Sequence, residues 1–304
     1  MTKRTSTEIE SEYKRLVVKE PHNYNMRCKM LWDLTSALLQ EGKREEAWEK
    51  SNEAFYYSCM NETVYEGFEV FSFRSFDEKG YSLDDIKKNT ISLVHPDMFN
   101  DPFDTVFFQW LRRKIDISEN TKKELAAIIL RRGDALKARC FMRTTPLVPS
   151  DGSVPQKVQD IKDVNPLMWA HYANSHKGFC AKYELTPSFV FQDETKHCFM
   201  RIGAIKYAEE INLTTGLSFE DALLMKSKIW SYENEVRAIL YDPECKEQVT
   251  TKPAPKLNSI YLGLRCSTSD RQEMTQALRG GAIPLYQMEY DPTDASKLIP
   301  KRIG

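Results

Sequence analysis

Residues 232–240 form a run that is rich in β-favouring residues and carries three charged side chains at alternate positions. We expect this run to be a strand, because valine, isoleucine and tyrosine favour extended backbone. The side chains of a strand alternate between its two faces, so Glu233, Glu235 and Arg237 are predicted to share one face. At a rise of roughly 3.3 Å per residue, the Cα atoms of the two glutamates then lie about 6 to 7 Å apart.

Two neighbouring carboxylates have a characteristic chemistry. Each disfavours ionisation of the other unless a cation lies nearby, and Arg237 is the obvious cation. A carboxylate pair beside a guanidinium suits acid–base catalysis, or stabilisation of a positive, oxocarbenium-like centre at a sugar carbon. An exposed strand face with alternating charge has the same spacing, so the pattern alone leaves both interpretations open.

The chain as a whole alternates between short strand patterns and helical patterns. Further strands are predicted at 68–76, 90–94, 138–142, 179–184, 199–207, 259–263 and 283–288. Helical periodicity occupies several of the intervals between them. We therefore expect an α+β fold with a mixed, largely antiparallel β core and flanking helices.

The first 65 residues differ from the rest. Amphipathic patterns at 24–40 and 44–60 predict a helical hairpin that turns at Gly42. Its pattern resembles a single tetratricopeptide unit, through Trp32, Leu34, Leu38, Gly42, Ala47 and Ala54. One such unit cannot bury its own apolar face. We expect the segment 1–65 to pack against a domain formed by residues 66–304, or to bind a protein partner.

Composition narrows the classes of partner. Lys and Arg number 43 and Asp and Glu number 44, so net charge does not support nucleic-acid binding, although a local basic patch is compatible with it. No apolar run reaches the roughly 20 residues of a membrane span, and we expect a cytoplasmic protein without membrane contact. The seven cysteines include no CxxC spacing, which favours reduced thiols and predicts no metal site.

Common nucleotide-binding and nucleophile motifs are absent from the sequence. It has no GxGxxG, P-loop or GxSxG motif. In the segment 99–104, Asp101 is placed to cap a helix that begins at Pro102. In the segment 166–180, His171 lies on a predicted short helix among aromatic residues, where a packed histidine and a catalytic one are alternatives.

Four segments together resemble the bacterial domain-of-unknown-function family 2971. They are FRSF at 73–76, FNDPFD at 99–104, LMWAHYANSHKGFC at 167–180 and KIWSYENEVR at 228–237. These segments occur in the order seen in that family. The resemblance covers about residues 68–298 and leaves the helical N-terminus outside.

The chain is similar, more loosely, to the ADP-ribosyltransferase fold, whose enzymes use NAD. There, an early strand carries an Arg or His that holds the nicotinamide nucleotide, and a later strand carries a catalytic Glu, often within Glu-x-Glu. The similarity implies that Arg74 matches the basic residue of the early strand and that Glu235, with Glu233, matches the catalytic Glu of the later strand. These enzymes also have a central aromatic or Ser element, which Tyr172 or Ser175 would match. It implies catalytic Glu235, Glu233 and His171, and NAD binding by Arg74, Tyr172, Asn100, Asp101 and Arg237.

The leading functional hypothesis is an NAD-dependent ADP-ribosyltransferase or NAD glycohydrolase of a bacterial toxin or phage-defence system. Glu235 would stabilise the cation and Glu233 would hold or deprotonate the acceptor. Arg74 would bind the pyrophosphate of NAD through its planar guanidinium.

Two other classes remain open. A non-catalytic sensor or protein-interaction module of a defence system would bind its partner through the N-terminal helices, and its charged residues would form structural networks around Trp169 and Trp230. A metal-dependent nuclease would use Asp101, Asp104 and the two glutamates, although their spacing matches no recognisable metal motif.

Overall fold

A computed structural model describes residues 4–58, 68–77, 81–99, 101, 104, 131, 133–144, 160–212, 223–278 and 282–304. The helix predicted to begin at Pro102 lies outside the described residues, and so does Asn100.

A mostly antiparallel sheet of 11 strands forms the core, which confirms the predicted α+β class. Its main path runs β13-β12-β11-β4-β1-β3-β9-β6-β5, with β2 and β10 branching from β3. The parallel exception within this sheet is the β11–β12 pair. The strands are β1 (Phe68–Arg74), β2 (Thr90–Val94), β3 (Leu136–Arg143), β4 (Phe179–Leu185), β5 (Phe191–Asp193), β6 (Cys198–Ala204), β9 (Glu235–Tyr241), β10 (Val249–Pro253), β11 (Lys256–Leu262), β12 (Leu285–Tyr290) and β13 (Leu298–Arg302).

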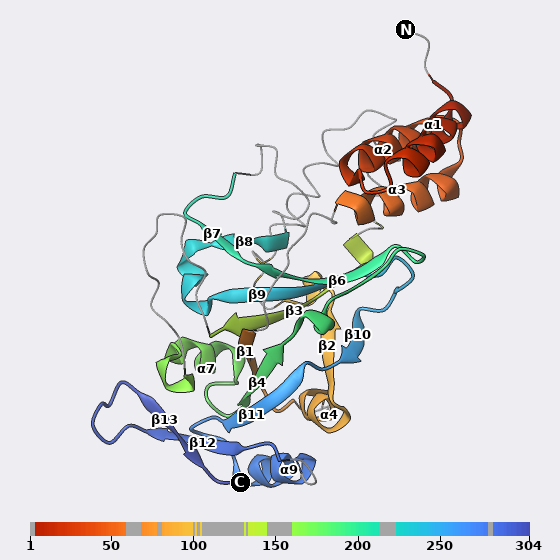
Figure 1. Ribbon diagram of the computed structural model, residues 1–304. Coiled ribbons are helices and arrows are strands. Elements are labelled where there is room, and N and C mark those ends of the chain that lie inside the picture. Colours follow the sequence, from red (N-terminus) through yellow and green to blue (C-terminus); the bar gives the residue numbers. More distant parts are fainter. Residues whose placement is uncertain are drawn as a thin grey trace.

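The helices lie around this sheet, and a separate pair of short parallel strands lies near one edge (Figure 1). The helices are α1 (Ser6–Lys19), α2 (Tyr24–Gln40), α3 (Arg44–Ser58), α4 (Tyr81–Lys88), α7 (Pro166–Tyr172) and α9 (Thr268–Ala277), and the short strands are β7 (Lys206–Ala208) and β8 (Met225–Ser227). Short 3₁₀ helices are η1 (Pro96–Met98), η2 (Ile161–Asp163), η3 (Pro187–Phe189) and η4 (Lys228–Glu233). Among the described helices, none combines the length and the apolar character that a membrane crossing requires.

The predicted N-terminal hairpin is present as α2 and α3, and its turn contains Gly42 at a positive φ of 78°. Figure 1 shows α1–α3 stacked at one end of the molecule, with α9 and the C-terminus at the other end. The hairpin packs on the sheet: the Phe55 ring lies 4.7 Å from the Tyr241 ring and 5.9 Å from the Phe199 ring, centroid to centroid. The Tyr241 hydroxyl also donates to Asn52 Oδ1 at 2.5 Å. The hairpin and the sheet therefore share one apolar cluster.

The sheet forks at one edge of β3. Strand β1 pairs with β3 through Val70 and Phe71, which lie opposite Arg143 and Met142. Strand β2 pairs with the same strand through Val94, opposite Ala138. Between these contacts, residues 139–141 have a strand neighbour only on the β9 side within the described part of the chain. The fork leaves an opening in the sheet.

Helix α7 is held against β1 by a tight turn. Asn174, Ser175 and His176 all have positive φ values, of 46°, 54° and 69°. Gly178 follows, and a Cβ atom built there would lie 2.0 Å from the carbonyl oxygen of Arg74. Only glycine permits this approach without a backbone shift. The turn fixes the position of α7 relative to the fork.

We predict that Phe55→Ala lowers the free energy of unfolding by about 3 to 5 kcal/mol, because it opens a cavity between α3 and the sheet. Urea denaturation followed by circular dichroism measures the change. Val18→Ala is the control, because Val18 is 83% exposed and its truncation should leave stability almost unchanged. Equal effects of the two substitutions would contradict the observed packing.

Candidate functional site

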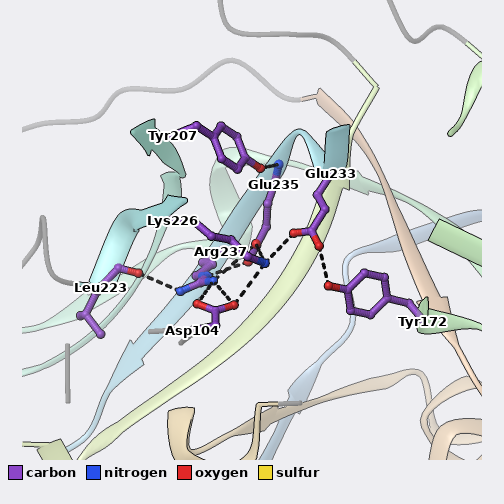
Figure 2. Close-up of polar contacts among 8 residues, drawn as sticks. All are labelled: Asp104, Tyr172, Tyr207, Leu223, Lys226, Glu233, Glu235 and Arg237. Atoms are coloured by element: carbon purple, nitrogen blue, oxygen red, sulfur yellow. Dashed lines mark hydrogen bonds and ion pairs between the residues drawn. The ribbon is translucent and has the colours of Figure 1, made fainter. Parts of the chain in front are cut away.

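Five charged side chains meet beside the first residues of β9 (Figure 2). Glu235 and Arg237 come from β9, Glu233 from the end of η4 and Lys226 from β8, while Asp104 comes from a distant part of the sequence. We call these five residues the charged cluster. Each side chain is at most 7% exposed. Such burial of charges is unfavourable unless they are paired and hydrogen-bonded.

The backbone corrects the prediction that Glu233, Glu235 and Arg237 share one strand face. Glu233 ends the 3₁₀ helix η4, Asn234 turns the chain with a left-handed conformation (φ 43°, ψ 50°), and the strand begins at Glu235. Glu235 and Arg237 do lie on one face of β9, as alternation requires. Glu233 reaches the same place through the turn rather than through strand periodicity.

Lys226 lies between the three carboxylates of the cluster. Its Nζ atom is 2.6 Å from Glu233 Oε2, 3.2 Å from Glu235 Oε2 and 3.2 Å from Asp104 Oδ2. With Arg237, the cluster has two cations for three acidic groups. Full ionisation would therefore leave one excess negative charge in a buried position.

Arg237 holds the second oxygen of Glu235 and of Asp104. Its Nε atom donates to Glu235 Oε1 at 2.6 Å, its Nη2 to Asp104 Oδ1 at 2.6 Å and its Nη1 to the Leu223 carbonyl at 3.0 Å. The similarity to NAD-using enzymes predicts that Arg237 binds NAD. All three of its nitrogens instead donate to the protein, and it is 1% exposed.

The two glutamates differ in proton affinity. Burial raises the pKa of Glu233 to about 7; Lys226 opposes this shift and the charge of Glu235 adds to it. Burial also acts to raise the pKa of Glu235, but the adjacent Arg237 and Lys226 outweigh it and lower that pKa to about 2. Near neutral pH, Glu235 is therefore ionised, whereas Glu233 is present in both its protonated and its ionised form. Two carboxylates whose environments separate their pKa values are typical of an acid–base pair.

Two tyrosines complete the polar contacts of the glutamates. The Tyr172 hydroxyl, carried by α7, donates to Glu233 Oε1 at 2.5 Å. The backbone N–H of Glu235 donates to the Tyr207 hydroxyl at 2.8 Å. Burial raises the pKa of Tyr172, and the negative charge of Glu233 adds to that shift, so the phenol remains a donor.

A cavity of about 770 Å³ opens beside the charged cluster at the fork of the sheet. Volumes of this order are usual for small-molecule sites. Five of the residues predicted from sequence line it: Arg74, His171, Tyr172, Glu233 and Glu235. Its walls include the aromatic residues Phe71, Phe73, Tyr81, Phe99 and Phe141.

Three further predicted site residues are not found among the cavity-lining residues that the structure describes. Arg237 and Asp101 are not among the described residues that line the cavity, and Asn100 lies outside the described part of the chain. His171 is exposed at the cavity wall, with its ring 6.1 Å from the Trp230 ring and 6.3 Å from the Tyr172 ring. It is therefore accessible to a ligand.

Sequence reasoning missed Lys226, which organises the cluster. The apolar residues just before it, from Leu223 to Met225, were a signal that this lysine is buried. Lys228, which belongs to the family-like segment, is exposed and pairs with Glu209. The nuclease hypothesis named Asp104 as a metal ligand. Burial, rather than motif membership, distinguishes the two lysines.

The cluster does not have the arrangement of a metal site. Within the segments that the structure describes, no group of three or more His, Cys, Asp or Glu side chains is placed to hold a metal ion. The cations Lys226 and Arg237 already occupy the space between the three acids. This geometry does not favour the nuclease hypothesis.

Comparisons with known proteins return no match, whether with protein-family models, curated proteins or solved structures. The resemblance to family 2971 therefore remains a prediction from the four sequence segments.

The opposite pKa shifts predict opposite pH dependences of stability. The folded pKa of Glu233, about 7, exceeds its unfolded value of 4.5, so its contribution to stability falls as the pH rises from about 4.5 to about 7. Wild type should therefore lose roughly 1 to 3 kcal/mol of unfolding free energy relative to Glu233→Gln when the pH rises from about 5 to about 8.

Glu235 should behave in the reverse way. Its folded pKa, about 2, lies below its unfolded value of 4.5, so its stabilisation is present above about pH 4.5 and is lost as the pH falls towards 2. The stability deficit of Glu235→Gln should be full at neutral pH and smaller at about pH 3. Urea denaturation across this pH range measures both differences, and parallel pH profiles for the two variants would contradict the assignment.

Proposed function

We propose that this protein cleaves the nicotinamide–ribose bond of NAD, as an NAD glycohydrolase or an ADP-ribosyltransferase. The observation that carries the proposal is the pair of glutamates with separated pKa values at the wall of one cavity. Breaking the bond between C1′ of the ribose and N1 of nicotinamide releases neutral nicotinamide and leaves positive charge on the ribose. Water or another nucleophile then attacks C1′ and loses a proton.

Glu235 and Glu233 suit different parts of this reaction. Glu235 is ionised at neutral pH, so it supplies fixed negative charge where an oxocarbenium-like ribose develops. Its ion pair with Arg237 holds the carboxylate in one orientation. Glu233 takes up the proton that the acceptor loses, because its pKa of about 7 lets it exchange protons near neutral pH.

Other residues of the cavity suit binding and orientation. Arg74 lines the cavity and supplies positive charge for a phosphate. Tyr172 donates to Glu233, and this contact fixes the direction of the acidic group. His171 and the aromatic walls offer surfaces on which a nucleotide base or the nicotinamide ring can stack.

The proposed compartment is the cytoplasm, where NAD is available. Within the described segments, Cys140, Cys180, Cys198, Cys245 and Cys266 are free thiols. Reduced thiols suit a reducing compartment.

A second candidate is a non-catalytic sensor that binds NAD or a related nucleotide. It is favoured by one observation: every acid of the charged cluster is already paired with Lys226 or Arg237. In that case the ion pairs serve rigidity, and ligand binding alters a contact with a protein partner. Binding of NAD without its consumption distinguishes this candidate from the enzyme.

The enzyme proposal predicts that the purified protein releases nicotinamide from NAD, which chromatography detects directly. Glu233→Gln should lower kcat by about 10² or more, because the variant cannot accept a proton, while KM changes little. The wild-type rate should rise with pH through about 7, and the variant should lose that dependence.

Glu209→Gln is the matched control, because Glu209 is an exposed glutamate paired with Lys228 away from the cavity. It should retain wild-type kcat and the wild-type pH profile. A folded wild-type protein that leaves NAD intact, with water and with protein acceptors, would refute the enzyme proposal. A rise in melting temperature on adding NAD would then support the sensor.

A further inference from the structure

Two arginines line the cavity on the face of the sheet opposite Glu235. Glu235 lies opposite Met142 in the β3–β9 register, and Met142 lies opposite Phe71 in the β1–β3 register. Arg139 is three positions from Met142, and Arg74 is three positions from Phe71. An odd separation in a strand reverses the face. The cavity therefore extends through the fork, with the acidic cluster towards one face and the two arginines towards the other.

Neither arginine has a carboxylate partner within the described segments. Arg139 is 8% exposed, and its Nη2 donates to the Ser72 hydroxyl at 2.6 Å, while no group of the described residues accepts a hydrogen bond from its Nε. Arg74 Nε donates to the Ser82 hydroxyl at 3.1 Å. Serine hydroxyls satisfy single N–H groups but carry no charge to balance the guanidinium.

The two acids that act electrostatically on these arginines are bonded elsewhere. Asp85 accepts from the Ser92 N–H and hydroxyl, both at 3.0 Å, and from the Thr90 hydroxyl at 3.1 Å. Asp77 accepts from the backbone N–H groups at the start of α4. Both carboxylates favour the charged form of the arginines from a distance, but within the described segments neither forms an ion pair with Arg74 or Arg139.

The two arginines also disfavour each other's charge. Burial lowers the pKa of Arg74 to about 9, and the positive charge of Arg139 adds to that shift. Burial also lowers the pKa of Arg139. Two buried positive charges without an ion-pair partner are unfavourable. A bound anion offsets the free-energy cost of their burial and of their mutual repulsion.

We infer that Arg139 and Arg74 together form a receptor for the phosphoryl oxygens of a diphosphate-containing ligand. Planar guanidinium groups bind phosphate oxygens in bidentate geometry, and two of them match the charge of a diphosphate. The unpartnered Nε of Arg139 is a donor that such a group would satisfy. Arg139 belongs to none of the four family-like segments, and its position in the fork is what assigns it.

The two arginines alone carry the inference that a diphosphate binds here. The further step, that this diphosphate is part of NAD, rests on the proposed function. In NAD the pyrophosphate and the nicotinamide–ribose bond are separate parts of one molecule. The cavity offers positive charge at one end and the glutamates at the other, so a single ligand can satisfy both.

Isothermal titration calorimetry with pyrophosphate at constant ionic strength tests the receptor. Wild type should bind pyrophosphate more tightly than inorganic phosphate or sulfate. Arg139→Met should raise the Kd for pyrophosphate by about tenfold or more, because the variant loses a charge-assisted bidentate contact. Arg139→Lys keeps the charge without the planar group and should give an intermediate Kd. This second variant serves if Arg139→Met does not fold.

Arg143→Met is the matched control. Arg143 is also on β3, with an Nε that lacks a partner, but it lies over the Phe68 ring and is not among the described residues lining the cavity. It should bind pyrophosphate as wild type does. Equal affinities of wild type and both Arg139 variants, or of pyrophosphate and sulfate, would overturn the inference.

The same variants separate this inference from the proposed function. Pyrophosphate binding that depends on Arg139, in a protein that leaves NAD intact, would keep the receptor and reject the enzyme. NAD cleavage with an unchanged KM in Arg139→Met would keep the enzyme and reject the receptor.

Discussion

The site depends on the ammonium group of Lys226. It contacts three buried carboxylates at 2.6 to 3.2 Å, and without it these three acidic groups would face Arg237 as their one cation within the charged cluster. Removing one member of a buried ion network commonly destabilises a protein by about 3 to 5 kcal/mol, because the remaining charges are left uncompensated. Lys226 contacts both glutamates, whereas Arg237 pairs with Glu235, and this added pairing lowers the pKa of Glu235 below that of Glu233.

Two features of the backbone bring this cluster to a cavity. The turn at Asn234 moves Glu233 out of the strand and towards Tyr172, while Glu235 remains on β9. The fork at β3 opens the sheet beside them, so that groups on both faces border one space. The result is a cavity with acids at one end and Arg74 and Arg139 at the other.

Strand and helix periodicity predicted the α+β class, the helical hairpin and the strands around β1, β2 and β4, because burial of alternate residues leaves a clear pattern. The pairing of Glu233 with Glu235 was predicted for a wrong reason: strand alternation does not reveal the left-handed residue Asn234 that ends η4. Lys226, Asp104 and Arg139 could not be assigned, because their roles arise from contacts between segments far apart in sequence. Arg74 and Tyr172 came from the resemblance, and the structure places both at the cavity.

The central claim is that burial and the unequal sharing of Lys226 and Arg237 give Glu233 an unusually high proton affinity. The direct measurement is an NMR titration of the Glu233 side-chain carboxyl carbon in the folded protein. The account predicts a midpoint near 7 in wild type, and a lower midpoint in Glu235→Gln, where a neighbouring negative charge is removed. A wild-type midpoint near the ordinary value of 4.5, or one that does not move in Glu235→Gln, would contradict it.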